Sequence, residues 1–154
     1  MPSPNLVTNR QARRDYLVED TLEAGMVLKG TEVKSLREGR GNLAGSYAVV
    51  EREEVWLHNF HISPYSSGGV FNPPPRRSRK LLLHKSEIKK LIGLTNVKGY
   101  TLVPLRLYLR RGLVKVELAV ARGKKSYDKR QAIKKRESDL EMARAVQHEK
   151  RGKR

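Results

Sequence analysis

The sequence lacks cysteine altogether and contains only one tryptophan and two phenylalanines in 154 residues. The absence of cysteine excludes disulfide bonds and thiolate chemistry and fits a cytoplasmic protein. No apolar run approaches the roughly 20 residues that a membrane-spanning helix needs, and no signal peptide opens the chain. Acidic residues are scarce as well, because 16 Asp and Glu stand against 33 Lys and Arg, for a formal net charge of +17. We therefore expect a polyanionic partner, nucleic acid rather than a membrane surface.

Recognisable catalytic patterns are also missing. The sequence has no G-x-S-x-G, no phosphate-binding Gly-Lys loop and no spaced set of carboxylates for metal-assisted cleavage of a phosphodiester. His58 and His61 are three residues apart on an expected strand, which places them on opposite faces. Neither forms a metal-ligand pattern with His84 or His148. We expect no metal, no cofactor and no enzymatic activity, and we weigh binding above catalysis.

Alternating apolar residues predict two β-hairpins. The string YTLVPLRLYLRRGLVKVELAVARG, residues 100–123, alternates on both sides of a turn at residues 110–112, with Leu105, Leu107 and Leu109 on one face. Pro104 lacks an amide donor, so it should lie at a strand start, a bulge or an edge.

The second hairpin is predicted from SYAVVEREEVWLHNFHI, residues 46–62. Its turn is expected at the charged residues 51–54. Trp56, Phe60 and Ile62 are then available for the core.

Two short helices interrupt this β pattern. In GTEVKSLREGRGN, residues 30–42, Thr31 is the expected cap and Gly39 suits the left-handed exit. In HKSEIKKLIG, residues 84–93, Ser86 is the expected start of an amphipathic helix. The stretch SSGGVFNPPPRRSRK, residues 66–80, is rich in turn formers and should be a mobile, exposed loop.

Short strands punctuated by two small helices predict a mainly β fold. A closed or nearly closed antiparallel barrel of the OB-like kind removes sheet edges, although the pattern alone does not choose it over a sandwich. We expect this RNA-binding barrel to comprise residues 1–123. Residues 124–154 form a basic C-terminal appendage.

The appendage cannot build a core of its own. Residues 123–154 hold twelve Lys or Arg against five Asp or Glu, with few large aliphatic side chains. We expect disorder in the free state, because so few apolar groups cannot offset the entropy of ordering. Residues 131–146 are nevertheless rich in helix formers, with Ile133 and Leu140 seven apart, so a helix can form on binding. A solubilising tail without specific contacts is the alternative.

Several strings carry a resemblance to a known family. NRQARRDY, LEAGMVLKGTEVKSLREGRGNL, HISPY, RKLLLH and ARGKKSYDKRQAIKKR resemble, in the same order and spacing, the SsrA-binding protein family, SmpB. The resemblance covers nearly the whole chain. It implies an OB-type barrel that holds the tRNA-like domain of transfer-messenger RNA and enters stalled bacterial ribosomes as a monomer in trans-translation. It also implies that the tail occupies the empty decoding site and the messenger RNA channel, helical on the ribosome.

The resemblance places the RNA-binding residues by matching motif positions. They are Asn9, Arg10, Arg13, Tyr16, Glu23, Glu32, Lys34, Arg79, Lys80, Leu82 and Lys115. Alternatives stay open: Tyr16 and Leu82 can be core residues, Arg79 and Lys80 can belong to a solvated loop, and an acid such as Glu23 can orient a basic neighbour.

The tail residues expected to contact the ribosome follow from the same resemblance. They are Lys124, Lys125, Tyr127, Asp128, Lys129, Arg130, Lys134, Lys135 and Arg136. Tyr127 is the candidate for stacking on a base of small-subunit RNA. The rival hypothesis is a general RNA-binding or ribosomal protein without a dedicated RNA partner, which would share the barrel, the charge and the tail.

Overall fold

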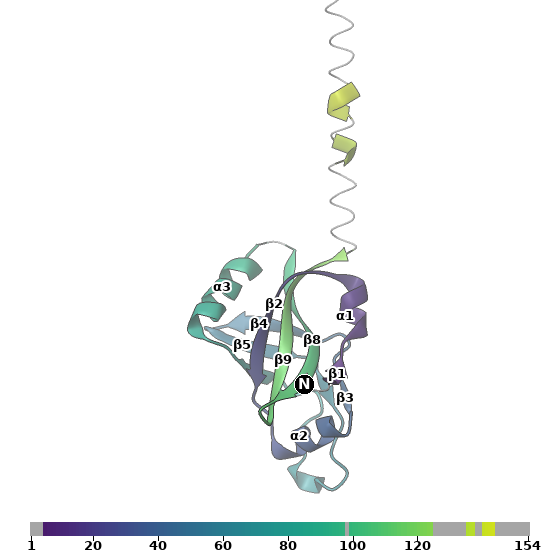
Figure 1. Cartoon of the computed structure of the whole chain (residues 1–154), viewed down its shortest axis with the longest axis vertical. Helices are drawn as coiled ribbons and strands as arrows, with labels where there is room; N and C mark the ends of the chain where they lie inside the picture. The colour runs from purple at the N-terminus through teal and green to yellow at the C-terminus, as the bar shows by residue number, and fades with distance from the viewer. Residues whose placement is uncertain (1–4, 98, 125–134, 138–139, 144–154) are drawn as a thin grey trace, which may run out of the picture.

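The computed structural model describes residues 5–97, 99–124, 135–137 and 140–143, and Figure 1 shows a β sheet with helices at its margins. The elements, in chain order, are β1 (Asn5–Thr8), α1 (Arg10–Asp15), β2 (Tyr16–Met26), α2 (Gly30–Arg37), β3 (Gly41–Asn42), β4 (Tyr47–Glu51), β5 (Glu54–His58), β6 (His61–Ile62), the 3-10 turn η1 (Gly69–Phe71), β7 (Arg79–Leu82), α3 (Lys85–Thr95), β8 (Tyr100–Arg110) and β9 (Leu113–Gly123).

The main sheet is antiparallel throughout. Its strand order is β1-β8-β4-β5-β7-β2-β9, and β9 pairs in addition with β8, so the pairings from β8 through β4, β5, β7, β2 and β9 return to β8. The pairing of β4 with β8 is the shortest, with Ala48 opposite Leu102 as its register pair. By contrast, β2 pairs with β9 from Tyr16 opposite Gly123 to Gly25 opposite Lys115. This mostly antiparallel arrangement with short helices confirms the predicted OB-like β fold.

The hairpin of β8 and β9 is confirmed, with a turn at Arg111 and Gly112, whose φ angles are 53° and 76°. The register shifts between Pro104 and Arg106, which places the proline at a bulge, one of the positions predicted for it. The extra residue at a bulge reverses the alternation of faces along the strand. As a result Leu107 lies in the main core whereas Leu105 packs in a separate cluster, so the prediction that the two share a face is wrong.

The hairpin of β4 and β5 is also confirmed, with Arg52 and Glu53 at its turn. Phe60 and Ile62 are buried as predicted. Trp56 is only half-buried, whereas its neighbours on β5 are fully buried, so its assignment to the core is wrong. Trp56 and Phe60 do not share a face because Asn59 lies between them with a φ of 62°. This residue ends β5 and reverses which side chains face inward on β6. The same break places His58 and His61 on different strands.

The helices begin earlier than predicted. The N-cap of α2 is Lys29, not Thr31, and the N-cap of α3 is His84, not Ser86. In each case a glutamate three residues later accepts a hydrogen bond from the N-cap amide, at 3.0 Å for Glu32 and 3.1 Å for Glu87. A carboxylate at this position satisfies one free amide of the helix start, so neither helix needs a hydroxyl cap at Thr31 or Ser86.

Gly39 follows α2 with a φ of 75°, which confirms the predicted left-handed exit. The six-residue helix α1 was not predicted, because a helix of fewer than two turns is too short to show a periodic pattern of apolar residues. Asn9 starts it by accepting a hydrogen bond from the Ala12 amide at 3.1 Å.

The core has two parts. The main cluster fills the inside of the sheet and includes Leu36, Phe60 and Leu118, all fully buried. A smaller cluster, made of Ala12, Val103, Leu105, Ala119 and Ala121, lies between α1 and the ends of β8 and β9. The helix α1 therefore covers one end of the hairpin that leads into the predicted tail (Figure 1).

Outside the sheet, residues 135–137 and 140–143 are helical, and their side chains are exposed. Both segments fall within the predicted helix at residues 131–146, of which the remainder lies outside the described residues. Disorder in the free state and helix formation on the ribosome stay predictions. Within the described residues, no helix is long and apolar enough to cross a membrane.

Candidate nucleic-acid interface

The eleven residues predicted to bind RNA fall into three separate groups. The first lies on the outer side of the sheet where β7, β2 and β9 are neighbours. Gly25 is opposite both Leu82 and Lys115 in the strand register. Glu23 joins Leu82 and Lys115 around a hollow of about 450 Å³, whose other lining residues are Gly25, Leu83, His84 and Glu87. We call this the β-face hollow.

Leu82 is displayed at the surface of the β-face hollow. Its exposed fraction is 52%, so the alternative that it is a core residue is wrong. Gly25 forms the floor beside it: a Cβ at this position would lie 3.4 Å from the Cβ of Leu82 and 3.6 Å from the Nζ of Lys115. The missing side chain therefore keeps the hollow open between an apolar and a cationic group.

Glu23 is fixed by two residues of β8. Its carboxylate accepts a hydrogen bond from the Tyr108 hydroxyl and two from Nη1 of Arg110, at 3.0 and 3.1 Å. The hydrogen bond from Tyr108 is the main reason why the pKa of Glu23 lies below its usual value. Burial, and then the hydrogen bond to Glu23, raises the pKa of Tyr108 to about 12. The carboxylate is therefore ionised and the phenol protonated at neutral pH, which gives Glu23 a single orientation.

Sequence reasoning missed Tyr108 and Arg110. The signal was available, because the two residues alternate with the apolar residues of β8 and so occupy the outer face of the predicted hairpin. Arg106, two residues before Tyr108 on that face, stacks its guanidinium 4.3 Å from the Tyr108 ring centroid. The outer face of the hairpin is thus an organised polar surface beside Glu23.

Lys80 lies next to this hollow without lining it. It is opposite Trp56 in the register, and its Nζ is 3.5 Å from a carboxylate oxygen of Glu54. Its side chain is 40% exposed. Lys80 therefore adds a second lysine beside Lys115 on this face, on the side toward β5.

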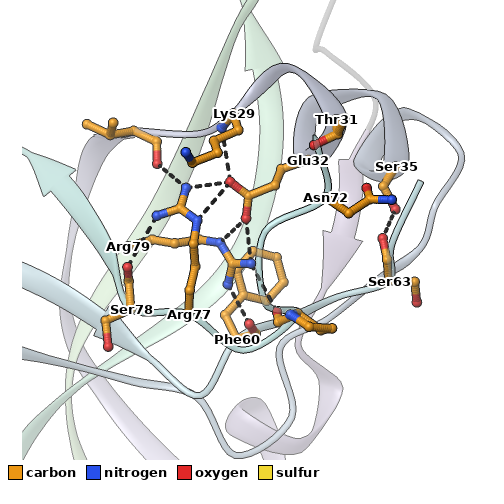
Figure 2. A network of polar contacts seen from close by, with 12 residues as sticks. Lys29, Thr31, Glu32, Ser35, Phe60, Ser63, Asn72, Arg77, Ser78 and Arg79 are labelled. Atoms are coloured by element: carbon orange, nitrogen blue, oxygen red, sulfur yellow. Dashed lines mark hydrogen bonds and ion pairs between the residues drawn. The ribbon is translucent and has the colours of Figure 1, made fainter. Parts of the chain in front are cut away.

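The second group surrounds α2 and includes a buried ion pair. Figure 2 shows the Glu32 carboxylate between the guanidinium groups of Arg77 and Arg79. Arg79 has no exposed surface, and Glu32 is 3% exposed. Nε and Nη2 of Arg79 lie 2.8 and 2.6 Å from Oε2 of Glu32, and its other hydrogen bonds go to the backbone oxygens of Phe60 and Pro75, at 2.5 and 3.0 Å. The alternative that Arg79 belongs to a solvated loop is wrong.

Ionisation of this pair follows from its hydrogen bonds. Burial alone would raise the pKa of Glu32, but the hydrogen bonds from Arg77, the Lys29 amide and Arg79 outweigh burial and lower it. Burial lowers the pKa of Arg79. Glu32 and Arg79 therefore form a charged link between α2 and β7, and neither has surface to offer an RNA in this conformation.

Lys34 lies elsewhere on α2. Its ammonium is 5.6 Å from the ring centroid of Tyr65. Together they line a different hollow of about 590 Å³, which shares no lining residue with the β-face hollow. The structure therefore separates Lys34 from Glu23 and Leu82.

The third group belongs to α1. Asn9 is 4% exposed and donates hydrogen bonds to the backbone oxygens of Pro104 and Leu43, at 2.8 and 3.4 Å, so it holds the start of α1 against the sheet. Arg10 and Arg13 are exposed on the helix. Tyr16 is half-buried against the smaller core cluster, which supports the packing alternative for this residue.

The start of the predicted tail lies beside α1. Nζ of Lys124 donates a hydrogen bond to the Arg13 backbone oxygen at 3.2 Å. A hollow of about 630 Å³ separates this point from the loop before β4, with Asn9, Tyr16, Tyr47 and Lys124 among its lining residues. Of the other predicted tail residues, Lys135 and Arg136 are exposed. Lys125, Tyr127, Asp128, Lys129, Arg130 and Lys134 lie outside the described residues.

Over the part of the chain that the structure describes, no cluster of three or more His, Asp or Glu side chains could hold a metal ion. The groups that remain are cations, an exposed leucine and a fixed carboxylate. These are groups for binding an anionic polymer by charge, apolar contact and hydrogen bonding.

Comparisons with known proteins place the chain in a family. A family model described as SmpB protein matches residues 6–148. The chain is 61% identical over 137 residues to the SsrA-binding protein of Caldicellulosiruptor saccharolyticus, covering 89% of this chain and 87% of the relative. It is 58% identical over 140 residues to the SsrA-binding protein of Geobacillus thermodenitrificans, covering 91% and 90%.

A solved structure has a similar fold. A chain from "tmRNA-SmpB: a journey to the center of the bacterial ribosome" matches with a TM-score of 0.66 and 53% sequence identity, over 77% of this chain and 83% of the other. Since the family model covers more than half of the sequence, the chain belongs to the SmpB protein family.

Proposed function

We propose that the protein binds the tRNA-like domain of transfer-messenger RNA and delivers this RNA to stalled ribosomes for trans-translation. The observation that carries the proposal is the β-face hollow: exposed Leu82, ionised Glu23 and Lys115 come together on three neighbouring strands of a chain with a net charge of +17. Two further supports are the name SsrA-binding protein carried by its relatives and a structural neighbour that contains tmRNA and SmpB.

Each group of the hollow suits one part of a folded RNA. Lys115 neutralises a phosphate, which releases counterions and makes binding fall with salt. Leu82 lies against a base or ribose, and Glu23 accepts hydrogen bonds from a ribose hydroxyl or a base amino group. Lys80, Arg10 and Arg13 add contacts to the phosphate backbone. Recognition is then by shape and backbone, with little reading of base sequence.

Glu32 and Arg79 support this surface without touching RNA. Their ion pair joins α2 to the first residue of β7, the strand that also carries Lys80 and Leu82. Holding β7 in register with β2 keeps Leu82 opposite Gly25. We assign both residues a positioning role.

For the tail, we propose that residues 124–154 form a separate unit from the barrel of residues 1–123. It is disordered when free, becomes helical on the ribosome, and occupies the decoding site and the messenger RNA channel. The helical backbone at residues 135–137 and 140–143 supports the helical state of the tail, and the exposed cations Lys135 and Arg136 support its contact with ribosomal RNA. Tyr127 is the candidate for stacking on a small-subunit base. The protein acts as a cytoplasmic monomer that binds without a cofactor and catalyses no reaction.

The first test compares RNA partners. Labelled transfer-messenger RNA bound to the full chain is competed with bulk tRNA at physiological salt, and transfer-messenger RNA should bind much more tightly. Equal competition by bulk tRNA would favour the alternative, a general RNA-binding or ribosomal protein.

The second test locates the site. Glu23→Ala combined with Lys115→Ala should weaken binding of the isolated tRNA-like domain and reduce the salt dependence. Lys89→Ala, which removes an exposed charge on α3, is the control and should change affinity little. If the double variant folds and binds like the control, the site is misplaced.

A third test addresses the tail. Removing residues 124–154 should leave RNA binding nearly intact and abolish tagging of peptides on stalled ribosomes. Full tagging by the shortened protein would contradict the proposed role of the tail.

A further inference from the structure

An exposed apolar tip lies between β6 and β7. Val70 and Phe71, in η1, are 94% and 79% exposed, the largest fractions among the large hydrophobic residues of the described chain. In Figure 1 this teal turn lies beyond α2, at the end of the sheet opposite to the end of β9. Val70 and Phe71 are adjacent and together form a small exposed apolar patch, which is a candidate binding surface when polar groups surround it.

Hydrogen bonds restrain the tip, although it lies in the stretch predicted to be a mobile loop. Asn72 accepts a hydrogen bond from the Tyr65 amide and donates one to the Tyr65 backbone oxygen, both at 2.9 Å. A Cβ at Gly68 would lie 2.7 Å from the Asn72 side chain, and Gly69 has a φ of 52°. Because these contacts restrain the turn, less conformational entropy is lost on binding than for an unrestrained loop.

A cationic hollow opens beside Phe71. Lys29, Lys34 and Tyr65 line it together with Gly30, Thr31, Ser67, Gly68 and Phe71, around a volume of about 590 Å³. Two ammonium groups and two aromatic rings therefore meet with no carboxylate among the lining residues. Glu32, the nearest acid in the sequence, is buried and paired with Arg77 and Arg79.

This combination selects an RNA ligand. An apolar protein partner covering Phe71 would desolvate Lys29 and Lys34 without supplying an anion, which is costly. A nucleotide supplies both requirements, because its base stacks on an aromatic ring and its phosphate pairs with a lysine. The volume suits one nucleotide, since ligand hollows span about 300–1,000 Å³.

We propose that the hollow of Lys29, Lys34, Tyr65 and Phe71, which we call the α2 hollow, binds an unpaired nucleotide of single-stranded RNA. The base stacks on Phe71 and the flanking phosphates pair with Lys29 and Lys34. This is a second RNA contact, separate from the β-face hollow because the two share no lining residue. It lets the protein contact two RNA segments at once.

The experiment must identify which residues the RNA contacts, because the basic tail also attracts RNA and contributes to the total affinity. A short single-stranded oligonucleotide carrying 5-bromouridine is irradiated with the full-length protein, and the crosslinked residues are identified by mass spectrometry. Crosslinks are expected at Phe71 or Tyr65. An unlabelled single strand should compete for them more strongly than a duplex of the same length.

Variants complete the test. Phe71→Ala should lower crosslinking at Tyr65 and weaken oligonucleotide binding about tenfold. The matched control is Leu113→Ala, which removes another exposed apolar side chain, at the β8–β9 turn and outside the α2 hollow. It should behave like the wild type. Both variants should bind the tRNA-like domain normally, because the β-face hollow is intact.

Three outcomes would overturn the proposal. The first is the absence of crosslinks between residues 65 and 71. The second is an unchanged oligonucleotide affinity in Phe71→Ala, which would leave the tip as a surface for another kind of partner. The third is a parallel loss of affinity for the tRNA-like domain in Phe71→Ala, which would make the α2 hollow part of a single RNA site. Failure of the proposed function would instead show in the competition with bulk tRNA, which does not depend on Phe71.

Discussion

Replacing Arg79 by methionine should strongly destabilise the fold. Methionine fills much of the buried space but removes the hydrogen bonds to Glu32 and to the backbone oxygen of Phe60. Breaking a buried ion pair costs about 3–5 kcal/mol, and a buried oxygen left without a partner costs about 1–3 kcal/mol. Arg77 still pairs with Glu32 and limits the loss. We therefore expect the free energy of unfolding to fall by about 4 kcal/mol, a large share of the roughly 5–15 kcal/mol typical of a domain.

Urea unfolding measures this loss, with the fluorescence of the single tryptophan as the signal. Trp56 is a good probe because it lies opposite Lys80, the residue that follows Arg79 on β7. With a slope of about 2 kcal/mol per molar urea, the midpoint should fall by about 2 M. The matched control is Arg76→Met, which removes an exposed guanidinium, hydrogen-bonded to the Asn59 side chain, from the loop that precedes β7 and should cost about 0.5 kcal/mol or less. If Arg79→Met shifts the midpoint no more than Arg76→Met, the buried link does not stabilise the fold.

The pH dependence of unfolding provides an independent check on the same link. The folded-state pKa of Glu32 lies below its usual value, so its contribution to stability is complete above the usual glutamate pKa. The contribution is lost as the pH falls through the lowered value. The stability difference between the wild type and Glu32→Gln should therefore be largest near neutral pH and shrink in acid. A difference that stays constant between pH 7 and pH 3 would mean that the carboxylate charge is not what matters.

Two further predictions concern the β-face hollow. Gly25→Ala should leave the melting temperature within a few degrees of the wild type, because the new Cβ would make only ordinary contacts with Leu82 and Lys115, at 3.4 and 3.6 Å. It should nevertheless weaken binding of the tRNA-like domain, measured by fluorescence anisotropy. Equal affinity would show that the ligand does not enter the hollow. Tyr108→Phe should raise the pKa of Glu23 toward its usual value, since the hydroxyl that mainly lowers it is gone; a carboxyl carbon titration by NMR that shows no rise would refute this assignment.

The hairpins could be predicted because they depend on neighbours in the sequence. The alternation of apolar residues in β8 and β9 and the charged turn between β4 and β5 are local signals. Errors arose where a single backbone irregularity reversed the alternation. The bulge after Pro104 moved Leu105 out of the main core, and the left-handed Asn59 moved Trp56 outward relative to Phe60. No period of two can reveal such a reversal, because it depends on the conformation of one residue.

The candidate site was harder to predict. The β-face hollow brings Glu23, Leu82 and Lys115 together through the register of β7 and β9 on β2, which no spacing in the sequence encodes. Motif resemblance, not pattern, supplied these residues. The burial of Glu32 and Arg79 was missed because charged residues are normally exposed, and their pairing spans 47 positions.

The pairing of β2 with β9 also has a consequence for biosynthesis. The two strands are separated by nearly ninety residues, so β2 leaves the ribosome long before its partner exists. At about 5–20 residues per second, synthesis of that interval takes roughly 4–18 s. During this time most of β2 has no strand partner, since its pairing with β7 involves Gly25 and Met26 at its end. Glu19, Asp20 and Glu23 give the strand like charges that discourage pairing with another chain. The sheet can be completed only after Gly123 has been made, when the remaining residues of the chain are still being synthesised.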